Sequence, residues 1–252
     1  MGSKTKIEWC DATWNPVTGC LHKCDYCYAR RIAERFGAGK SETLDGLTVL
    51  NEYATSRRGK KEPYPYGFEP TFHRYRLDEP KKWPKAKTIF VCSMADLFGD
   101  WVPDEWIKEV FKACQEAPQH TYLFLTKNPK RLCDMAGAGK LPEDDNFWYG
   151  STLDCKNAKY YPGRITDHTF LSIEPLREYM DAGLGSFGSA EWIIIGAETG
   201  NRKNKVVPEK EWIENICAAA DLTQAAVFMK DSLVPIVGEE HMRRELPWEL
   251  PG

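Results

Sequence analysis

Three cysteines lie close together near the start of the chain. Cys20, Cys24 and Cys27 have the spacing C-x3-C-x2-C, directly before a stretch with helical periodicity. A closed structural zinc site or an ordinary ferredoxin cluster uses four protein ligands. Three thiols in one loop therefore favour an iron–sulfur cluster with one iron left open to another molecule. The same trio could instead form a zinc site completed by His22 or by a distant ligand, or be three unrelated structural thiols.

The other six cysteines show no second cluster motif. They are Cys10, Cys92, Cys114, Cys133, Cys155 and Cys217, and none lies within four residues of another. Because residues 1–11 contain no apolar core of a secretory signal, we expect reduced thiols and a cytoplasmic location. No run of 18 apolar residues occurs, so we expect no membrane partner.

The cysteine loop requires a scaffold, and the hydrophobic pattern predicts an α/β fold. Expected strands cover residues 12–17, 69–74, 88–92, 121–125, 147–151, 169–173, 192–196 and 226–230. Several of these are continuous apolar runs, which are typical of buried parallel strands. With 252 residues and 42% hydrophobic residues, the chain suits one domain, 1–252. We predict a (β/α)8-type barrel, full or partial, with parallel strands.

Helical periodicity separates several of these strands. Helices are expected over residues 28–36, 104–114 and 208–220. Asp104 is the expected amino-terminal cap of the second helix. Residues 38–67 have no clean period and form a long insertion after the first helix, with one short helix expected near residues 47–53. Loops of this length in a compact domain are usually functional.

Polar residues follow the ends of most expected strands, where barrel enzymes hold their catalytic groups. They are Ser93, Asp96, Thr126, Lys127, Ser151, Glu174, Glu198 and Lys230. Any strand must end at a polar loop, so some of these side chains are expected to be merely solvated. Glu174 and Glu198 stand out because each closely follows an apolar run.

Positive charge is concentrated in one segment, although the whole chain has a formal net charge of -3. Residues 53–87 carry +6, so the remainder carries -9. The segment also contains Tyr53, Tyr64, Tyr66, Phe68, Phe72, Tyr75 and Trp83. Basic residues among aromatic ones suit a phosphate backbone with stacked bases; a solvated basic face is the alternative. With a second basic loop at 200–205, the candidate substrate contacts are Arg57, Arg58, Arg202, Lys203 and Lys230.

The cysteine loop, with Tyr26 before its third cysteine, resembles that of the radical S-adenosylmethionine (SAM) enzymes. A wider resemblance, to an uncharacterised radical SAM family common in phages and bacteria, runs from about residue 6 to residue 230. It is carried by Trp9, Trp14–Pro16, Cys92–Phe98, Leu125–Pro129, Ser172–Leu176 and Ile195–Gly200. The superfamily's Gly-Gly-Glu-like segment is replaced by Pro70–Arg74, which leaves the ligand of the SAM amino group unassigned.

The resemblance implies a 4Fe-4S cluster on Cys20, Cys24 and Cys27, whose fourth iron binds SAM. The residues expected to contact the cofactor are Tyr26, Ser93, Asp96, Thr126, Ser151 and Glu174. Those expected from their positions to be catalytic are Glu174, Glu198, Lys127 and Cys155; Cys155 would donate a hydrogen atom, and a buried, inert thiol is the alternative. A flavodoxin- or ferredoxin-like partner would supply one electron, and SAM cleavage would give a 5′-deoxyadenosyl radical that abstracts hydrogen from a substrate.

We interpret the chain as a radical SAM enzyme acting on a nucleotide or nucleic-acid base, such as a modified base of phage DNA in the host cytoplasm. Two alternatives remain open. One is a radical SAM enzyme that acts on a peptide or a small metabolite. The other is not an enzyme but a zinc- or cluster-bearing module that binds nucleic acid.

Overall fold

The fold comes from a computed structural model, which describes residues 5–37, 48–56, 58–154, 166, 168–181 and 187–249. The chain divides into two compact units, one of residues 1–5 and 10–124 and one of residues 6–9 and 125–252. Arg57 and Cys155, two of the expected site residues, lie outside the described residues. The expectation of a single domain stays a prediction, and each unit is described by itself.

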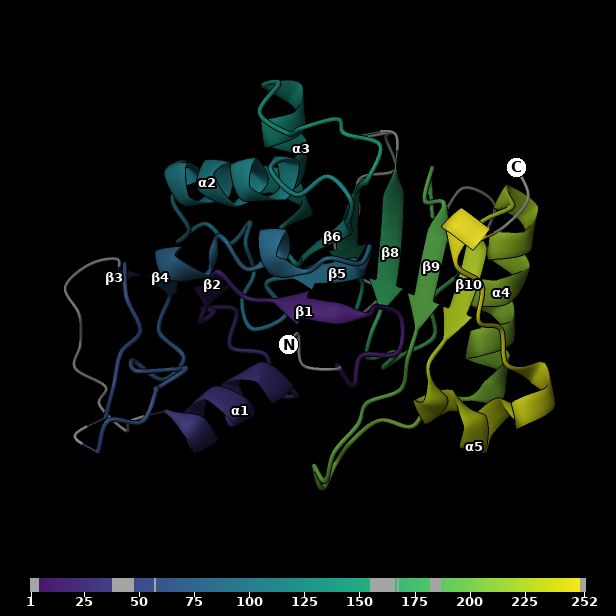
Figure 1. Cartoon of the computed structure of the whole chain (residues 1–252). Coiled ribbons are helices and arrows are strands. Elements are labelled where there is room, and N and C mark those ends of the chain that lie inside the picture. Colours follow the sequence, from purple (N-terminus) through teal and green to yellow (C-terminus); the bar gives the residue numbers. More distant parts are fainter. Residues whose placement is uncertain are drawn as a thin grey trace. The chain divides into compact units, whose positions relative to one another are not determined.

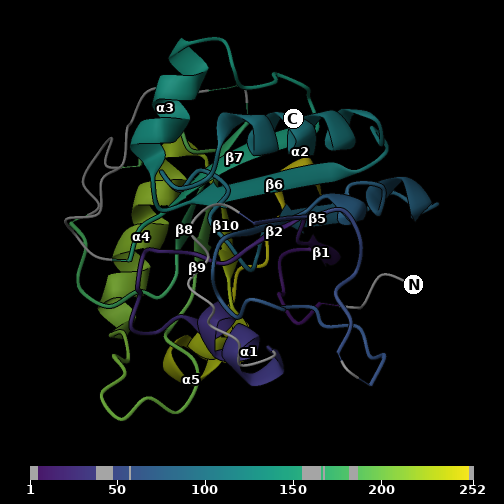
Figure 2. The ribbon, with the colours of Figure 1, turned by 90° about the vertical axis from the view of Figure 1, so that its left-hand side faces the viewer.

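The first unit contains three parallel strands in the order β1-β5-β6. These are β1 (Ala12–Trp14), β5 (Thr88–Val91) and β6 (Thr121–Thr126). Helix α2 (Asp104–Gln115) covers β6, where the Phe111 ring lies 5.2 Å from that of Phe124 (Figure 2). The predicted cap is wrong by one residue, since Pro103 precedes the helix and Asp104 is its first residue. The Asp104 carboxylate still favours the helix as a negative charge in the first turn.

A second, small sheet in this unit corrects two predictions. Strand β4 (Thr71–His73) pairs antiparallel with β2 (Val17–Thr18) and parallel with β3 (Thr48–Leu50). Residues 69–74 are therefore not a barrel strand, and residues 47–53 contain a strand where we expected a helix. The β-branched Thr48 and Val49 favour a strand. Helix α1 (Tyr28–Phe36) has the predicted bounds.

The second unit contains four parallel strands. They are β7 (Phe147–Thr152), β8 (Thr169–Ile173), β9 (Trp192–Ile195) and β10 (Ala226–Met229), and each neighbours the next. Figure 1 shows β8, β9 and β10 side by side. Every residue of β8, β9 and β10 is buried, as their continuous apolar runs predicted. The seven parallel strands of the two units confirm the α/β fold in its partial (β/α)-barrel form.

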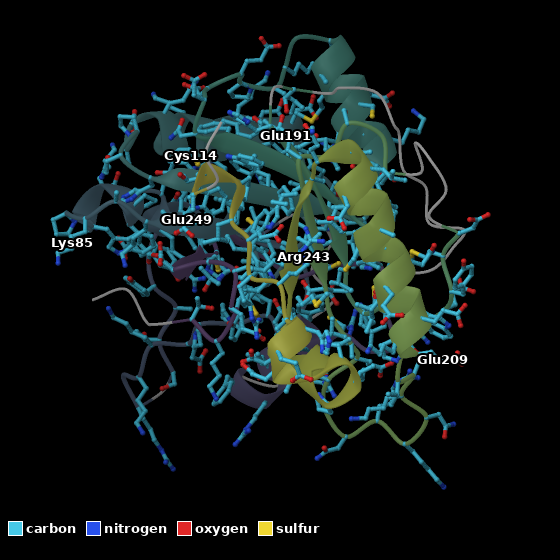
Figure 3. The ribbon with its side chains drawn as sticks, turned by 90° about the vertical axis from the view of Figure 1, so that its right-hand side faces the viewer. Lys85, Cys114, Glu191, Glu209, Arg243 and Glu249 are labelled. Atoms are coloured by element: carbon cyan, nitrogen blue, oxygen red, sulfur yellow. The ribbon has the colours of Figure 1, made fainter. Side chains whose placement is uncertain are left out.

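The helices of the second unit are α3 (Pro129–Gly137), α4 (Lys210–Thr223) and α5 (Val234–Val237). Helix α4 lies alongside β10 (Figure 1) and starts two residues later than predicted, directly after Glu209 (Figure 3). Helix α3 was not predicted. Short 3-10 turns span Arg74–Arg76, Pro80–Lys82, Asp231–Leu233, Glu239–His241 and Pro247–Glu249.

The carboxyl-terminal segment covers the β10 strand. The Met229 amide donates to the Arg243 carbonyl at 2.8 Å, and the Glu245 amide donates to the Val227 carbonyl at 3.0 Å. The Arg243 side chain, labelled in Figure 3, also pairs with Asp221 of α4 at 2.7 Å. An unpaired strand edge invites aggregation, so this segment protects the sheet.

A cluster of aromatic rings fills the second unit near its amino-terminal segment. The Trp9 ring lies 6.1 Å from that of Trp192, edge to face, and 6.5 Å from that of Phe170. The Trp248 ring lies 5.3 Å from that of Trp192. Residues from segments near both ends of the chain therefore contact the same buried ring, Trp192, with Trp9 buried and Trp248 exposed. Among the described residues, no helix has the length and apolar character needed to cross a membrane.

Replacement of Trp9 by alanine should destabilise the protein strongly, because Trp9 is 3% exposed. Truncation of a buried Trp typically costs about 3–5 kcal/mol. Denaturant unfolding would measure the loss, with Tyr179→Ala as the control, since Tyr179 is 46% exposed in the same unit and surface changes stay within about 0.5 kcal/mol. Equal midpoints for the two variants would contradict this role for Trp9.

Candidate functional site

The cysteine loop joins β2 to α1 in the first unit. The Cys27 sulfur accepts a hydrogen bond from the Arg30 amide at 3.3 Å and so caps α1. The Arg30 guanidinium donates to the Cys20 carbonyl at 3.2 Å. Arg30 therefore binds both ends of the loop, and the predicted strand–loop–helix arrangement is present.

Gly19 starts the loop in a conformation that only glycine adopts easily. Its φ is +87°, and an added Cβ would lie 2.2 Å from the Glu69 carbonyl oxygen. Its amide donates to the Met94 carbonyl at 2.9 Å, and the Cys20 amide donates to the Phe68 carbonyl at 3.3 Å. The glycine lets the backbone approach these neighbours closely.

The loop carries three thiols, the type of ligand that holds iron–sulfur clusters. All three thiols are partly exposed and free of disulfides. Burial raises the pKa of Cys20 to about 12, and the charges of Asp96, Cys24 and Cys27 also raise it. The Cys20 thiol is therefore neutral at pH 7, and a metal would displace its proton on binding. Among the described residues, no three His, Cys, Asp or Glu side chains already have a geometry that could hold a metal ion.

Two predicted cofactor residues, Ser93 and Asp96, lie against this loop. The Ser93 hydroxyl donates to Asn15 Oδ1 at 3.2 Å, and the Ser93 carbonyl accepts from the Tyr28 hydroxyl at 2.9 Å. Asp96 is buried, and its Oδ2 lies 2.7 Å from His22 Nε2. The sequence placed Asp96 after a strand but contained no signal for its pairing with His22. The Tyr26 carbonyl accepts a hydrogen bond from Arg31 at 3.5 Å.

In the second unit, Glu174 and Lys230 form one cluster. Glu174 Oε1 lies 2.7 Å from Lys230 Nζ, while Oε2 accepts from the Ser172 hydroxyl at 3.1 Å and from the Trp9 indole at 3.3 Å. Gly196 leaves room for the carboxylate, since an added Cβ would lie 2.9 Å from Glu174 Oε1. The sequence identified Glu174 and Lys230 separately, but it did not predict the contacts of Ser172 and Trp9 with Glu174.

Glu198 pairs with Arg202 in the loop after β9. Its two oxygens accept from the Arg202 guanidinium at 2.5 and 2.6 Å. These hydrogen bonds hold the pKa of Glu198 below its ordinary value, against the opposing effect of burial. Arg202, a candidate phosphate contact, is thus engaged with Glu198, whereas Lys203 is exposed.

The remaining candidates lie after β6 and in β7. Lys127 Nζ lies 2.8 Å from Asp154 Oδ2. Thr126 is buried, and its hydroxyl accepts from the Asn128 amide at 2.9 Å. Ser151 is buried in β7. The structure therefore gives Lys127 a carboxylate partner that sequence reasoning missed.

The basic segment 53–87 separates into parts with different environments. Arg58 and Lys60 are exposed on a hairpin, whereas Arg74 pairs with Glu109 at 2.8 Å and Lys81 with Glu116 at 2.6 Å. Phe68 and Phe72 are 7% and 0% exposed. These two rings belong to the core, so their inclusion among base-stacking aromatics was wrong.

A family model described as "Protein of unknown function (DUF5131)" matches residues 4–234. The chain belongs to this family. Among curated proteins, no match to this chain was found. Solved structures of two spore photoproduct lyase variants match it with a TM-score of 0.51 each, at 10% and 9% sequence identity. Each match covers 91% of this chain and 78% of the other. At this identity the likeness shows a shared fold.

Replacement of Glu198 by glutamine should destabilise the protein at pH 7 by about 2 kcal/mol, because two hydrogen bonds lose their charge. A carboxyl group whose pKa is lower in the folded state than in the unfolded state stabilises the fold at pH values above its unfolded-state pKa. This stabilisation disappears as the pH falls through the folded-state pKa. We therefore expect the difference between wild type and variant to shrink below the ordinary pKa of glutamate and to vanish as the pH falls through the lowered pKa of Glu198. Denaturant unfolding at several pH values would measure this, and a difference independent of pH would contradict it.

Proposed function

We propose that the protein is a radical SAM enzyme and that Cys20, Cys24 and Cys27 hold its 4Fe-4S cluster. The observation that carries the proposal is the presence of three cysteines, none in a disulfide, on one loop whose two ends are bound by Arg30. The resemblance of the loop and the fold shared with spore photoproduct lyase, a radical SAM enzyme, support it. When bound and reduced by one electron, the cluster supplies cleavage of SAM to methionine and a hydrogen-abstracting 5′-deoxyadenosyl radical.

The chain's own residues would bind and orient the reactants. Glu174 is held by three donors, and Lys230 stands beside it as a partly exposed cation. We propose that Glu174 and Lys230 bind polar groups of a reactant, such as an amine, a hydroxyl or a carboxylate. Lys127 has a similar partly exposed position beside Asp154. The residues proposed to contact SAM are Tyr26, Ser93, Thr126, Ser151 and Glu174.

Other residues and a partner protein would assist the reaction. Cys155 would be the hydrogen-atom donor, and Glu198, held by Arg202, would shape the site rather than take up a proton. A flavodoxin- or ferredoxin-like protein would supply the electron. None of the eight described cysteines forms a disulfide, which agrees with a reducing compartment such as the cytoplasm. A phage origin is a prediction from the resemblance.

Anaerobic reconstitution with iron and sulfide tests the cluster. We expect a brown protein with close to four irons per chain that produces 5′-deoxyadenosine from SAM under reductant. Cys20→Ala, Cys24→Ala and Cys27→Ala should each abolish this activity, because each removes one of three ligands. Cys133→Ala, which changes a thiol on α3, is the matched control. A colourless protein with one zinc would contradict the proposal and support a zinc-bearing binding module.

For the substrate, we propose a nucleotide or a nucleic-acid base. A hairpin whose described residues are 54–56 and 58–62 supports this. The Ser56 amide donates to the Lys60 carbonyl at 2.8 Å, and the Glu62 amide donates to the Ala54 carbonyl at 2.9 Å. The hairpin exposes Arg58, Lys60 and Lys61. At its base, the Tyr53 ring is 46% exposed, and Lys61 Nζ lies 3.8 Å from its centre. Exposed cations beside an exposed ring suit a phosphate backbone with a stacked base.

The double variant Arg58→Ala/Lys60→Ala should bind a single-stranded oligonucleotide about tenfold more weakly at low salt and should show a shallower salt dependence. Fluorescence anisotropy would measure both quantities. Lys108→Ala/Lys112→Ala is the matched control, because it removes two exposed cations from α2 in the same unit. If wild type shows no salt-dependent binding to DNA, RNA or nucleotides, the substrate would instead be a peptide or a small metabolite.

A further inference from the structure

One side chain of the cysteine loop is bound to the segment that follows β5. His22 lies between Cys20 and Cys24 in sequence, and its Nε2 is 2.7 Å from Asp96 Oδ2. The Asp96 side chain is 6% exposed and that of His22 is 23% exposed. The pair is therefore largely shielded from water, where a charge-assisted hydrogen bond is strong.

Asp96 is itself fixed in place. Its second oxygen, Oδ1, accepts from the Phe98 amide at 3.0 Å. On the other side of the pair, the His22 ring lies edge-on to the Trp101 ring, with 4.9 Å between their centres. His22 is thus held by a hydrogen bond and by a ring contact, both from residues that follow β5.

The same segment also contacts the loop at its two ends. The Met94 carbonyl accepts from the Gly19 amide at 2.9 Å, before the first cysteine. The Ser93 carbonyl accepts from the Tyr28 hydroxyl at 2.9 Å, after the third cysteine. Together with the contact to His22, residues 93–96 bind the loop before, within and after the cysteine trio. Such contacts reduce the backbone freedom that ligand binding would otherwise have to remove.

The sequence suggested that Asp96 touches the cofactor, but its contacts indicate a different role. Both carboxylate oxygens already accept hydrogen bonds from protein groups. A direct contact with SAM would have to compete with His22 for Oδ2. The pairing also engages one of the two ring nitrogens through which His22 could ligate zinc.

We propose that His22 and Asp96 are a positioning pair, which binds the middle of the cysteine loop to the end of β5 and so fixes Cys20 and Cys24 for the cluster. This inference rests on the proposed function. Neither residue is catalytic, because each acts through the cysteines. Partners that orient metal ligands typically contribute 10–100-fold to metal affinity.

A double-mutant cycle tests the pair through iron binding, independently of turnover. Reconstituted wild type, Asp96→Ala, His22→Ala and the double variant would be compared by the rate of iron release to a chelator. We expect each single variant to release iron about tenfold faster, and the double variant to release it no faster than either one. Asp96→Asn, which keeps an acceptor oxygen, should restore much of the retention. Glu109→Ala, which removes a carboxylate from a surface ion pair of the same unit, should match wild type.

Other outcomes would overturn the inference. Additive effects in the double variant would show that the residues act separately. Wild-type iron retention in Asp96→Ala, with loss only of the SAM-induced change in the electron paramagnetic resonance spectrum, would make Asp96 a direct SAM contact. If Asp96→Ala fails to fold, the rates of iron release from His22→Ala and Asp96→Asn decide: the first should be about tenfold faster than wild type and the second close to it. Failure of wild type to take up iron would instead defeat the proposed function itself.

Discussion

Burial of parallel strands is the constraint on which the rest of the structure depends. Strands β8, β9 and β10 are buried along their whole lengths, so they have no room for charged side chains. Polar residues are therefore confined to the ends of the strands and to the loops that follow them. Glu174 and Glu198 occupy such positions, as does Asp96 in the other unit. Within each unit, this confinement leaves the polar candidates at strand ends and in loops without any single motif that includes them all.

Each buried or partly buried carboxylate among the candidates has a cation or a histidine beside it. Glu174 lies beside Lys230 and Glu198 beside Arg202, while Asp96 lies beside His22. An isolated buried charge is costly, and removal of one partner leaves the other uncompensated. For this reason several of the basic residues that looked available for a substrate are engaged within the protein. The exposed hairpin of residues 54–56 and 58–62 keeps cations that remain accessible.

The cysteine loop is built on a different principle from the strands. Its backbone is held by hydrogen bonds from its neighbours, while Cys20 and Cys27 pack against a small apolar cluster that includes Phe68. Arg30 binds its two ends, and the segment after β5 binds it at further points. The conformation of the loop therefore depends on residues about 70 positions away, which its own spacing does not reveal.

The sequence by itself determined the features that depend on local pattern. Apolar runs identified the buried strands, helical periodicity identified α1, α2 and α4, and the spacing of Cys20, Cys24 and Cys27 identified the candidate cluster site. Tertiary structure decided what depends on long-range pairing. It placed β4 in a small sheet instead of the barrel, made a strand of Thr48–Leu50 and joined Glu174 to Lys230 and His22 to Asp96. The physical reason is that short segments of similar composition can pair in several ways, and only the packing of the whole unit selects one of them.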